Sequence, residues 1–310
     1  IPLFYYKHRL EILHGGLLVY YRVMETILLF FLGFFILVRG ARFLVDGAVS
    51  ISKTLGLSSW VIGVLVVGIG TSIPEFSINI VSALKETDIG VGTLLGSNTF
   101  NILFILGLSA LISPALIRKE WVVKDFVLNL CAILVSVLFL VLPIFGDTSY
   151  VGITTQEAYF IFSLFIVWIL YMLFRKPSYS AEEEESSKHF KLWASLLMIA
   201  GGFLGVFFGA QWVVSGAEHF ALFLGISAHI VGLSVIAIGT SLPEISVSLV
   251  AAYKGRTDIA VGNIIGSNIF DFIGIIGTAG LISQIPFDYN LLLDTVMTLI
   301  AGIFLISSMY

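Results

Sequence analysis

Long apolar runs recur along this chain and limit what it can fold into. Runs of roughly 20 residues, such as those around 26–37, 126–144, 159–174 and 192–208 with their flanks, have the length that an α-helix needs to cross a membrane. Only 12% of the 310 residues are charged, about half the usual fraction of a soluble domain, and the mean hydropathy is +1.04. The chain is therefore predicted to be an all-α polytopic membrane protein.

The apolar runs predict nine membrane-spanning helices. Their approximate bounds are 26–50, 60–84, 90–113, 122–144, 156–175, 191–222, 230–252, 260–283 and 288–310. We expect a tenth helix to be missing after the ninth. We also expect residues 1–23, which contain no clean apolar run, to be a non-native or upstream segment before a first helix that opens at Met24.

An internal repeat relates the two halves of the chain. Glu75 and Glu244 are 169 positions apart (244 − 75 = 169), and Ser97 and Ser267 are 170 apart (267 − 97 = 170), so one residue was inserted in the turn between them. The first copy occupies spans one to three and the second occupies spans six to eight. Because five crossings separate the copies, they must have opposite orientations in the membrane.

This arrangement predicts two inverted five-helix repeats, at 24–175 and 191–310, with a cytoplasmic linker at 176–190. Lysine and arginine occur mainly in the loops after odd-numbered spans, whereas the alternate loops contain only Lys85. Cytoplasmic loops are enriched in these residues, so odd-numbered spans should end in the cytoplasm. The glutamates at 182–185 lack the spaced ligands of an EF-hand, and we interpret the linker as a solvated hinge.

Each repeat contains the motif Gly-Thr-Ser-x-Pro-Glu near the middle of an apolar span, at 70–75 and at 239–244. A carboxylate at that depth is costly unless it is paired or hydrated, so Glu75 and Glu244 indicate an ion path. The proline before each glutamate lacks an N–H and frees a carbonyl one turn earlier. Discontinuous helices at the membrane midplane are therefore expected in both repeats.

The helix that follows carries Gly-Ser-Asn-x-x-Asn at 96–101 and Gly-Ser-Asn-x-x-Asp at 266–271. A spacing of four residues places the serine and the last residue of each motif on one helix face. All candidate ligands are oxygens, which suit hard cations such as Ca2+ and Na+, whereas Zn2+ or copper would favour His or Cys. Helix packing explains the individual hydroxyls equally well, but not the three acids. The predicted metal ligands are Glu75, Glu244, Asp271, Asn101, Thr71, Ser72, Ser97, Thr240, Ser241 and Ser267.

These paired motifs resemble the α-repeats of the cation/Ca2+ exchanger superfamily, specifically the prokaryotic sodium/calcium exchangers, and the match covers nearly the whole chain from Met24. The resemblance implies a multi-pass antiporter of the prokaryotic cell membrane that exchanges Na+ for Ca2+ by alternating access. It also implies ion binding by the backbone carbonyls of Gly68 and Ala237, although an alanine is expected where this chain has Gly68. We expect a monomer in the lipid bilayer that is not an enzyme, with Ca2+ and Na+ as substrates, no cofactor and no nucleic-acid partner.

Three alternatives remain at this stage. An H+/Ca2+ antiporter of the same superfamily would typically carry a motif closer to Gly-Asn-x-x-Glu, and the hydroxyl-rich pattern here favours Na+ instead. A K+-dependent Na+/Ca2+ antiporter is open, because Asp271 opposite Asn101 could tune monovalent specificity. A cation channel would also place acids in a pore, but inverted repeats with broken helices argue against it.

Overall fold

The computed structural model describes residues 2–114, 119–142, 144–145, 150–175, 190–225 and 237–307. In these ranges seven helices are long and apolar enough to cross a membrane, and one bent pair of helices makes an eighth span. The second half of the predicted span 230–252 is described as a shorter apolar helix, Leu242–Tyr253, whereas its residues 230–236 lie outside the described part. Most of the predicted linker, 176–189, lies outside it as well.

The helices follow the predicted spans closely, with one clear error at the start. The first helix begins at Pro2 rather than near Met24, because helical hydrogen bonds are made within the segment and do not require an apolar sequence. Whether residues 1–23 are native stays a prediction. In chain order the elements are α1 (Pro2–Leu55), α2 (Ser59–Ile62), the π-helix η1 (Gly63–Gly68), α3 (Ile69–Thr71), α4 (Ile73–Leu84), α5 (Ile89–Phe100), the π-helix η2 (Asn101–Ile105), α6 (Leu106–Ile112), α7 (Lys119–Val141), β1 (Gly152–Ile153), α8 (Thr155–Phe174), α9 (Leu192–Phe223), α11 (Ala237–Thr240), α12 (Leu242–Tyr253), α13 (Thr257–Ile269), the π-helix η5 (Phe270–Ile275), α14 (Ile276–Ile282), β2 (Ile285–Pro286), the 3-10 helix η6 (Tyr289–Leu291) and α15 (Leu292–Ser307).

Both repeats contain the predicted break. The span 59–84 bends by 49° between α3 and α4, and Ser72 is the residue at the break. Ser241 separates α11 from α12 at the equivalent position of the second repeat. The proline of each motif lies in the first turn of the following helix, where its missing N–H leaves no hydrogen bond unmade.

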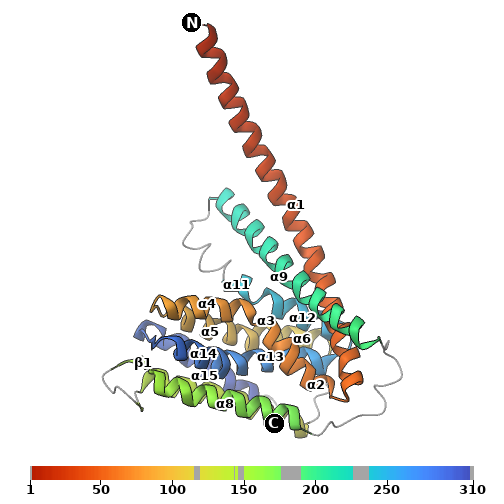
Figure 1. Cartoon of the computed structure of the whole chain (residues 1–310), viewed down its shortest axis with the longest axis vertical. Helices are drawn as coiled ribbons and strands as arrows, with labels where there is room; N and C mark the ends of the chain where they lie inside the picture. The colour runs from red at the N-terminus through yellow and green to blue at the C-terminus, as the bar shows by residue number, and fades with distance from the viewer. Residues whose placement is uncertain are drawn as a thin grey trace.

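Two long helices, α1 and α9, lie together obliquely across one face of the remaining helices (Figure 1). Gly47 lies against Ile199 and Gly216 lies against Phe30, so the two helices run antiparallel, as inverted copies require. Glycines recur every seven residues along each side of this contact. They are Gly33, Gly40 and Gly47 on α1 and their counterparts Gly202, Gly209 and Gly216 on α9.

These glycines bring the backbones of α1 and α9 into direct contact. A Cβ atom added to Gly40 would lie 2.7 Å from the backbone nitrogen of Val206, and one added to Gly209 would lie 2.6 Å from that of Leu37. Small residues have this function in membranes, where close van der Waals packing rather than water exclusion holds helices together.

A second backbone contact joins the two repeats and positions their motifs. The π-helix η1 of the first repeat packs on α13 of the second, and a Cβ on Gly68 would lie 2.7 Å from the backbone nitrogen of Ser267. Gly266 likewise lies directly against the backbone of Val64. An alanine at Gly68 would push these segments apart, so the glycine permits the close packing that sets the motifs side by side.

Described residues next to the loops after odd-numbered spans are bonded to one another at one end of the molecule. The Asp125 carboxylate accepts bonds from Arg175 at 2.6 Å and from the Trp60 indole at 2.7 Å, which joins the starts of α2 and α7 to the end of α8. At the same end Lys254 pairs with Asp46 of α1 at 2.6 Å. The other end contains the one pair of strands in the described part of the chain, an antiparallel pairing of Gly152 with Pro286 and of Ile153 with Ile285.

The contact between α1 and α9 can be tested on α9 alone. Gly209→Ala should lower the free energy of unfolding by about 1–3 kcal/mol, because its Cβ would meet the backbone of α1. The matched control is Gly201→Ala on the same helix, since a Cβ there would have nothing within 4 Å. Thermal unfolding of the purified protein in detergent should show a lower midpoint only for Gly209→Ala. Equal midpoints for the two variants would contradict the proposed packing.

Candidate cation-binding site

Three carboxylates are buried where the two repeats meet. Glu75 lies in the first turn of α4, Glu244 in the first turn of α12 and Asp271 in η5, and their side chains are 1%, 0% and 0% exposed. In the described ranges the two salt bridges are Arg175–Asp125 and Lys254–Asp46, and neither involves these acids. Burial of an uncompensated charge costs several kcal/mol, so the three acids require cations or protons from outside the chain.

Hydroxyl groups link the motifs of one repeat to those of the other. The hydroxyls of Ser72 and Ser267 share a hydrogen bond of 2.6 Å, and the equivalent pair, Ser97 and Ser241, lies at 3.3 Å. Ser97 also donates to Glu75 Oε1 at 3.4 Å. The predicted inverted repeat is therefore seen at the level of single side-chain contacts, because equivalent serines of the two copies form equivalent pairs.

The remaining predicted residues lie around the same centre. Thr71, Ser72, Ser97, Asn101, Ser241 and Ser267 are all at most 5% exposed. Thr240 is half-buried, and its hydroxyl lies beside the carboxylate of Glu75. Gly68 is buried one turn before Thr71 and its carbonyl accepts from that hydroxyl at 3.2 Å, whereas Ala237 is the first residue of α11.

Sequence reasoning missed two asparagines that contact the predicted ligands directly. Asn98 donates to Asp271 Oδ2 at 2.8 Å, and its counterpart Asn268 accepts from the Asn101 amide at 3.1 Å. Both are fully buried and both occupy the third position of the Gly-Ser-Asn motif. The sequence did contain a sign of their role, because the same asparagine recurs in both copies of the motif. Each of the two contacts the last motif residue of the other repeat.

A third asparagine, Asn263 of α13, was also missed. Its Nδ2 donates to Ser248 Oγ at 2.9 Å, and Ser248 in turn donates to the carbonyl of Ala260 at 3.2 Å. The Asn263 Oδ1 accepts from the Thr71 hydroxyl at 3.0 Å. The single hydroxyl proton of Thr71 is accepted by Asn263 Oδ1 or by the Gly68 carbonyl, and either bond leaves the hydroxyl lone pairs available to a cation.

Several oxygens of the site have no partner inside the chain. Neither Glu244 oxygen has a hydrogen bond of ordinary geometry, although the hydroxyls of Thr71 and Ser267 lie close by. Buried polar atoms in folded proteins almost always have partners, so unpartnered oxygens in one place point to a missing ligand. The unpartnered oxygens at this site are Glu75 Oε2, Asn98 Oδ1, Asn101 Oδ1, Glu244 Oε1, Glu244 Oε2 and Asp271 Oδ1.

The acids do not form a metal chelate by themselves. Among the described residues, no three His, Cys, Asp or Glu side chains come together closely enough to hold a metal ion. Amide and hydroxyl oxygens would therefore have to complete the coordination. Such a mixed oxygen shell suits Ca2+ or Na+ and does not suit metals that need nitrogen or sulfur.

Irregular helices present the two residues that differ between the copies. Asn101 opens the π-helix η2 and Asp271 lies in the π-helix η5. A π-helical turn inserts a residue into an α-helix and is common at functional sites. The apolar periodicity of these spans gave no sign of it.

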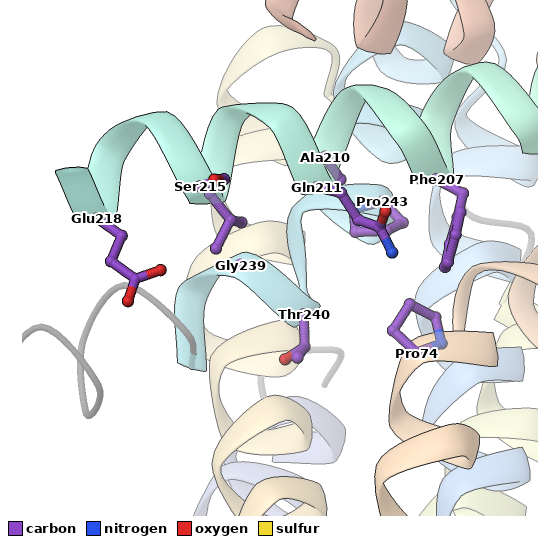
Figure 2. A pocket seen from close by; sticks show the side chains of 10 residues that line it. Pro74, Phe207, Ala210, Gln211, Ser215, Glu218, Gly239, Thr240 and Pro243 are labelled. Carbon is purple, nitrogen blue, oxygen red and sulfur yellow. The ribbon is translucent and has the colours of Figure 1, made fainter. Parts of the chain in front are cut away.

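A cavity of about 230 Å³ lies between the C-terminal half of α9, away from the linker, and the residues next to the two helix breaks (Figure 2). The face of α9 that includes Phe207, Gln211 and Glu218 forms one wall. Pro74, Gly239, Thr240 and Pro243, all next to the two helix breaks, form the other. Because Thr240 lies beside Glu75, the cavity ends at the predicted ligands.

Comparisons with known proteins agree with this architecture. The sequence profile of the family described as "Sodium/calcium exchanger protein" matches residues 25–175 and 194–310. The chain is 30% identical over 295 residues to "Sodium/calcium exchanger MaX1" of Methanosarcina acetivorans, with 84% of this chain and 83% of that protein covered. It is 35% identical over 268 residues to "Inner membrane protein YrbG" of Escherichia coli, with 82% and 79% covered. A solved structure of the sodium-calcium exchanger NCX_Mj, soaked with Na+ and Sr2+, superimposes with a TM-score of 0.77 at 30% identity and covers 92% of this chain and 90% of that one.

The two missed asparagines give a test of the site that compares the copies with each other. Asn98→Ala should weaken Ca2+ binding by about 10-fold or more, because residues that orient a metal ligand typically contribute 10- to 100-fold to affinity. Asn268→Ala should weaken Ca2+ binding by a smaller factor, since Asn268 is hydrogen-bonded to a neutral amide whereas Asn98 is hydrogen-bonded to a carboxylate. Calorimetric titration of Ca2+ into the detergent-purified protein without Na+ measures both. Equal losses, or a larger loss for Asn268→Ala, would contradict the assigned geometry.

Proposed function

Because this chain belongs to the sodium/calcium exchanger protein family, we propose that it exchanges Na+ for Ca2+ across a membrane at the junction of its two repeats. The observation that carries the proposal is the set of buried acids, Glu75, Glu244 and Asp271, with unpartnered oxygens around them and no cationic side chain paired to them in the described ranges. A multi-pass protein whose deepest charges lack compensation needs a mobile cation.

We assign the cation to an oxygen cage shared equally by the two copies. Each copy contributes a glutamate and two neighbouring hydroxyls from the broken helix, and a serine with Asn or Asp from the next one. Each copy also contributes one backbone carbonyl, from the residue three positions before the threonine of the motif. The proposed ligands are Glu75, Thr71, Ser72, Ser97, Asn101 and the Gly68 carbonyl, with Glu244, Thr240, Ser241, Ser267, Asp271 and the Ala237 carbonyl.

Charge balance explains why the two ions would be exchanged rather than leak. Three carboxylates compensate two or three positive charges, which either one Ca2+ or several Na+ ions can supply. An empty cage with all three acids ionised would be strongly destabilised inside the membrane, so the empty carrier should cross rarely. Occupancy by alternative cations at overlapping oxygens is the basis of antiport.

Alternating access is supported by a difference between the two copies. Val214 and Glu218 of α9 line the cavity and are half-buried, whereas their counterparts on α1, Val45 and Val49, are 0% and 5% exposed. The inverted repeat thus has an open side and a closed side at equivalent positions. If the two copies exchanged these conformations, the cage would open to the opposite end.

The closed end carries Lys254, which follows α12 and is bonded to Asp46 of α1, and Arg175, which follows α8 and is bonded to Asp125. We assign this end to the cytoplasm because loops on that side are enriched in Lys and Arg. The cavity then opens to the outside of the cell, and the site of function is the prokaryotic plasma membrane.

Proteoliposomes test the coupling ion. Radioactive Ca2+ uptake should be driven by an outward Na+ gradient and should be unchanged by K+. An outward H+ gradient without Na+ should give no uptake, and uptake with that gradient alone would replace the proposal with H+/Ca2+ antiport. A requirement for K+ would indicate the K+-dependent reaction, and currents far above carrier rates would indicate a channel.

The cage is tested by Glu75→Gln and Glu244→Gln. Each should reduce Na+-driven Ca2+ uptake to the level of empty liposomes, because each removes a carboxylate that compensates the charge of the bound cation. Glu86→Gln is the matched control, since Glu86 is an exposed carboxylate in the turn between α4 and α5. All three proteins should elute as monodisperse species. Wild-type uptake by either cage variant would refute the assigned ligands.

A further inference from the structure

The outer cavity contains a polar stripe that the proposed ion cage does not use. Gln211, Ser215 and Glu218 all line it from α9, and their spacing of four and three residues places them on one face of that helix. Figure 2 shows the Gln211 and Glu218 side chains on the side of α9 that faces Gly239 and Thr240, with Glu218 at one end. The stripe runs along the cavity whose opposite wall contains Thr240, beside Glu75.

Glu218 is the one charged residue among the described residues that line this cavity. The two described salt bridges, Arg175–Asp125 and Lys254–Asp46, do not involve it. Glu218 is half-buried at the wall of the cavity, so water can still reach it. An acid there sets up an attractive potential for cations in a passage with low-dielectric walls.

The fold itself does not require an acid at this position. The counterpart of Glu218 in the first repeat is Val49, 169 positions earlier, which is packed in the closed side at 5% exposure. The same helix position therefore carries an apolar residue where the passage is closed and a carboxylate where it is open. A structural role common to the two copies does not explain Glu218.

We propose that Glu218 captures hydrated Ca2+ at the mouth of the outer cavity and delivers it towards Thr240 and the cage. This rests on the proposed function and adds an external loading site to it. The site needs only one carboxylate, because the cation keeps most of its water there and dehydrates on reaching the cage. Na+ enters through the same mouth, but its Coulomb energy with the Glu218 carboxylate is half that of Ca2+ at the same distance, because Na+ carries half the charge.

The inference is tested by Ca2+ transport kinetics in membrane vesicles of both orientations at low ionic strength. Glu218→Gln should raise the KM for Ca2+ supplied at the outer face about three- to tenfold and leave kcat unchanged. The KM for Ca2+ supplied at the cytoplasmic face and the half-saturating Na+ concentration should change less. The increase should shrink in high salt, where a partly exposed charge is screened.

Two further variants separate capture from other effects. Glu218→Asp keeps the charge and should keep the outer KM near the wild-type value, whereas a purely structural role would make this shorter side chain fail as well. Glu86→Gln removes a carboxylate outside the cavity, and an equal rise in KM would assign the effect to general surface charge. An unchanged outer KM in Glu218→Gln would overturn the inference while wild-type exchange still upheld the antiport itself.

Discussion

Three carboxylates buried between two inverted repeats, without a described cationic partner, are the constraint on which the rest of this molecule depends. Hydrocarbon surrounds the helices, so a bare charge there is tolerated only if a mobile cation or proton visits it. Glu75, Glu244 and Asp271 are each at most 1% exposed, and four of their six oxygens have no hydrogen-bond partner. The protein is thus built around an interaction that its own side chains leave incomplete, which is what a carrier of ions requires.

Glycine packing makes such a centre possible. The site lies where η1 of the first repeat touches the backbone of α13 of the second, and Gly68 and Gly266 allow that approach. The same device joins α1 to α9 through Gly40 and Gly209. Without large side chains at these contacts, Ser72 can reach Ser267 across the repeats, and small relative movements of the helices need not displace interlocked side chains.

The departures from symmetry matter as much as the symmetry. Asn101 faces Asn268, whereas its counterpart Asp271 faces Asn98, so one amide of the cage is replaced by a charge in the other copy. The open side carries Glu218 where the closed side carries Val49. Inverted repeats supply two equivalent end states in principle, and these substitutions make the outer and inner faces chemically different.

The sequence by itself determined the spans, the inverted repeat, the broken helices and ten of the side chains at the centre, because each depends on hydrophobic length, chain offset or a local motif. It left Asn98, Asn268 and Asn263 unassigned, since an asparagine in an apolar span has no meaning until its partner on another helix is known. Only the tertiary structure decided which hydroxyls pair across the repeats and which end of the cage is open. It also placed Glu218 at the wall of the opening. Those facts depend on contacts between residues up to about 200 positions apart, set by how closely the helices pack, and no local pattern encodes them.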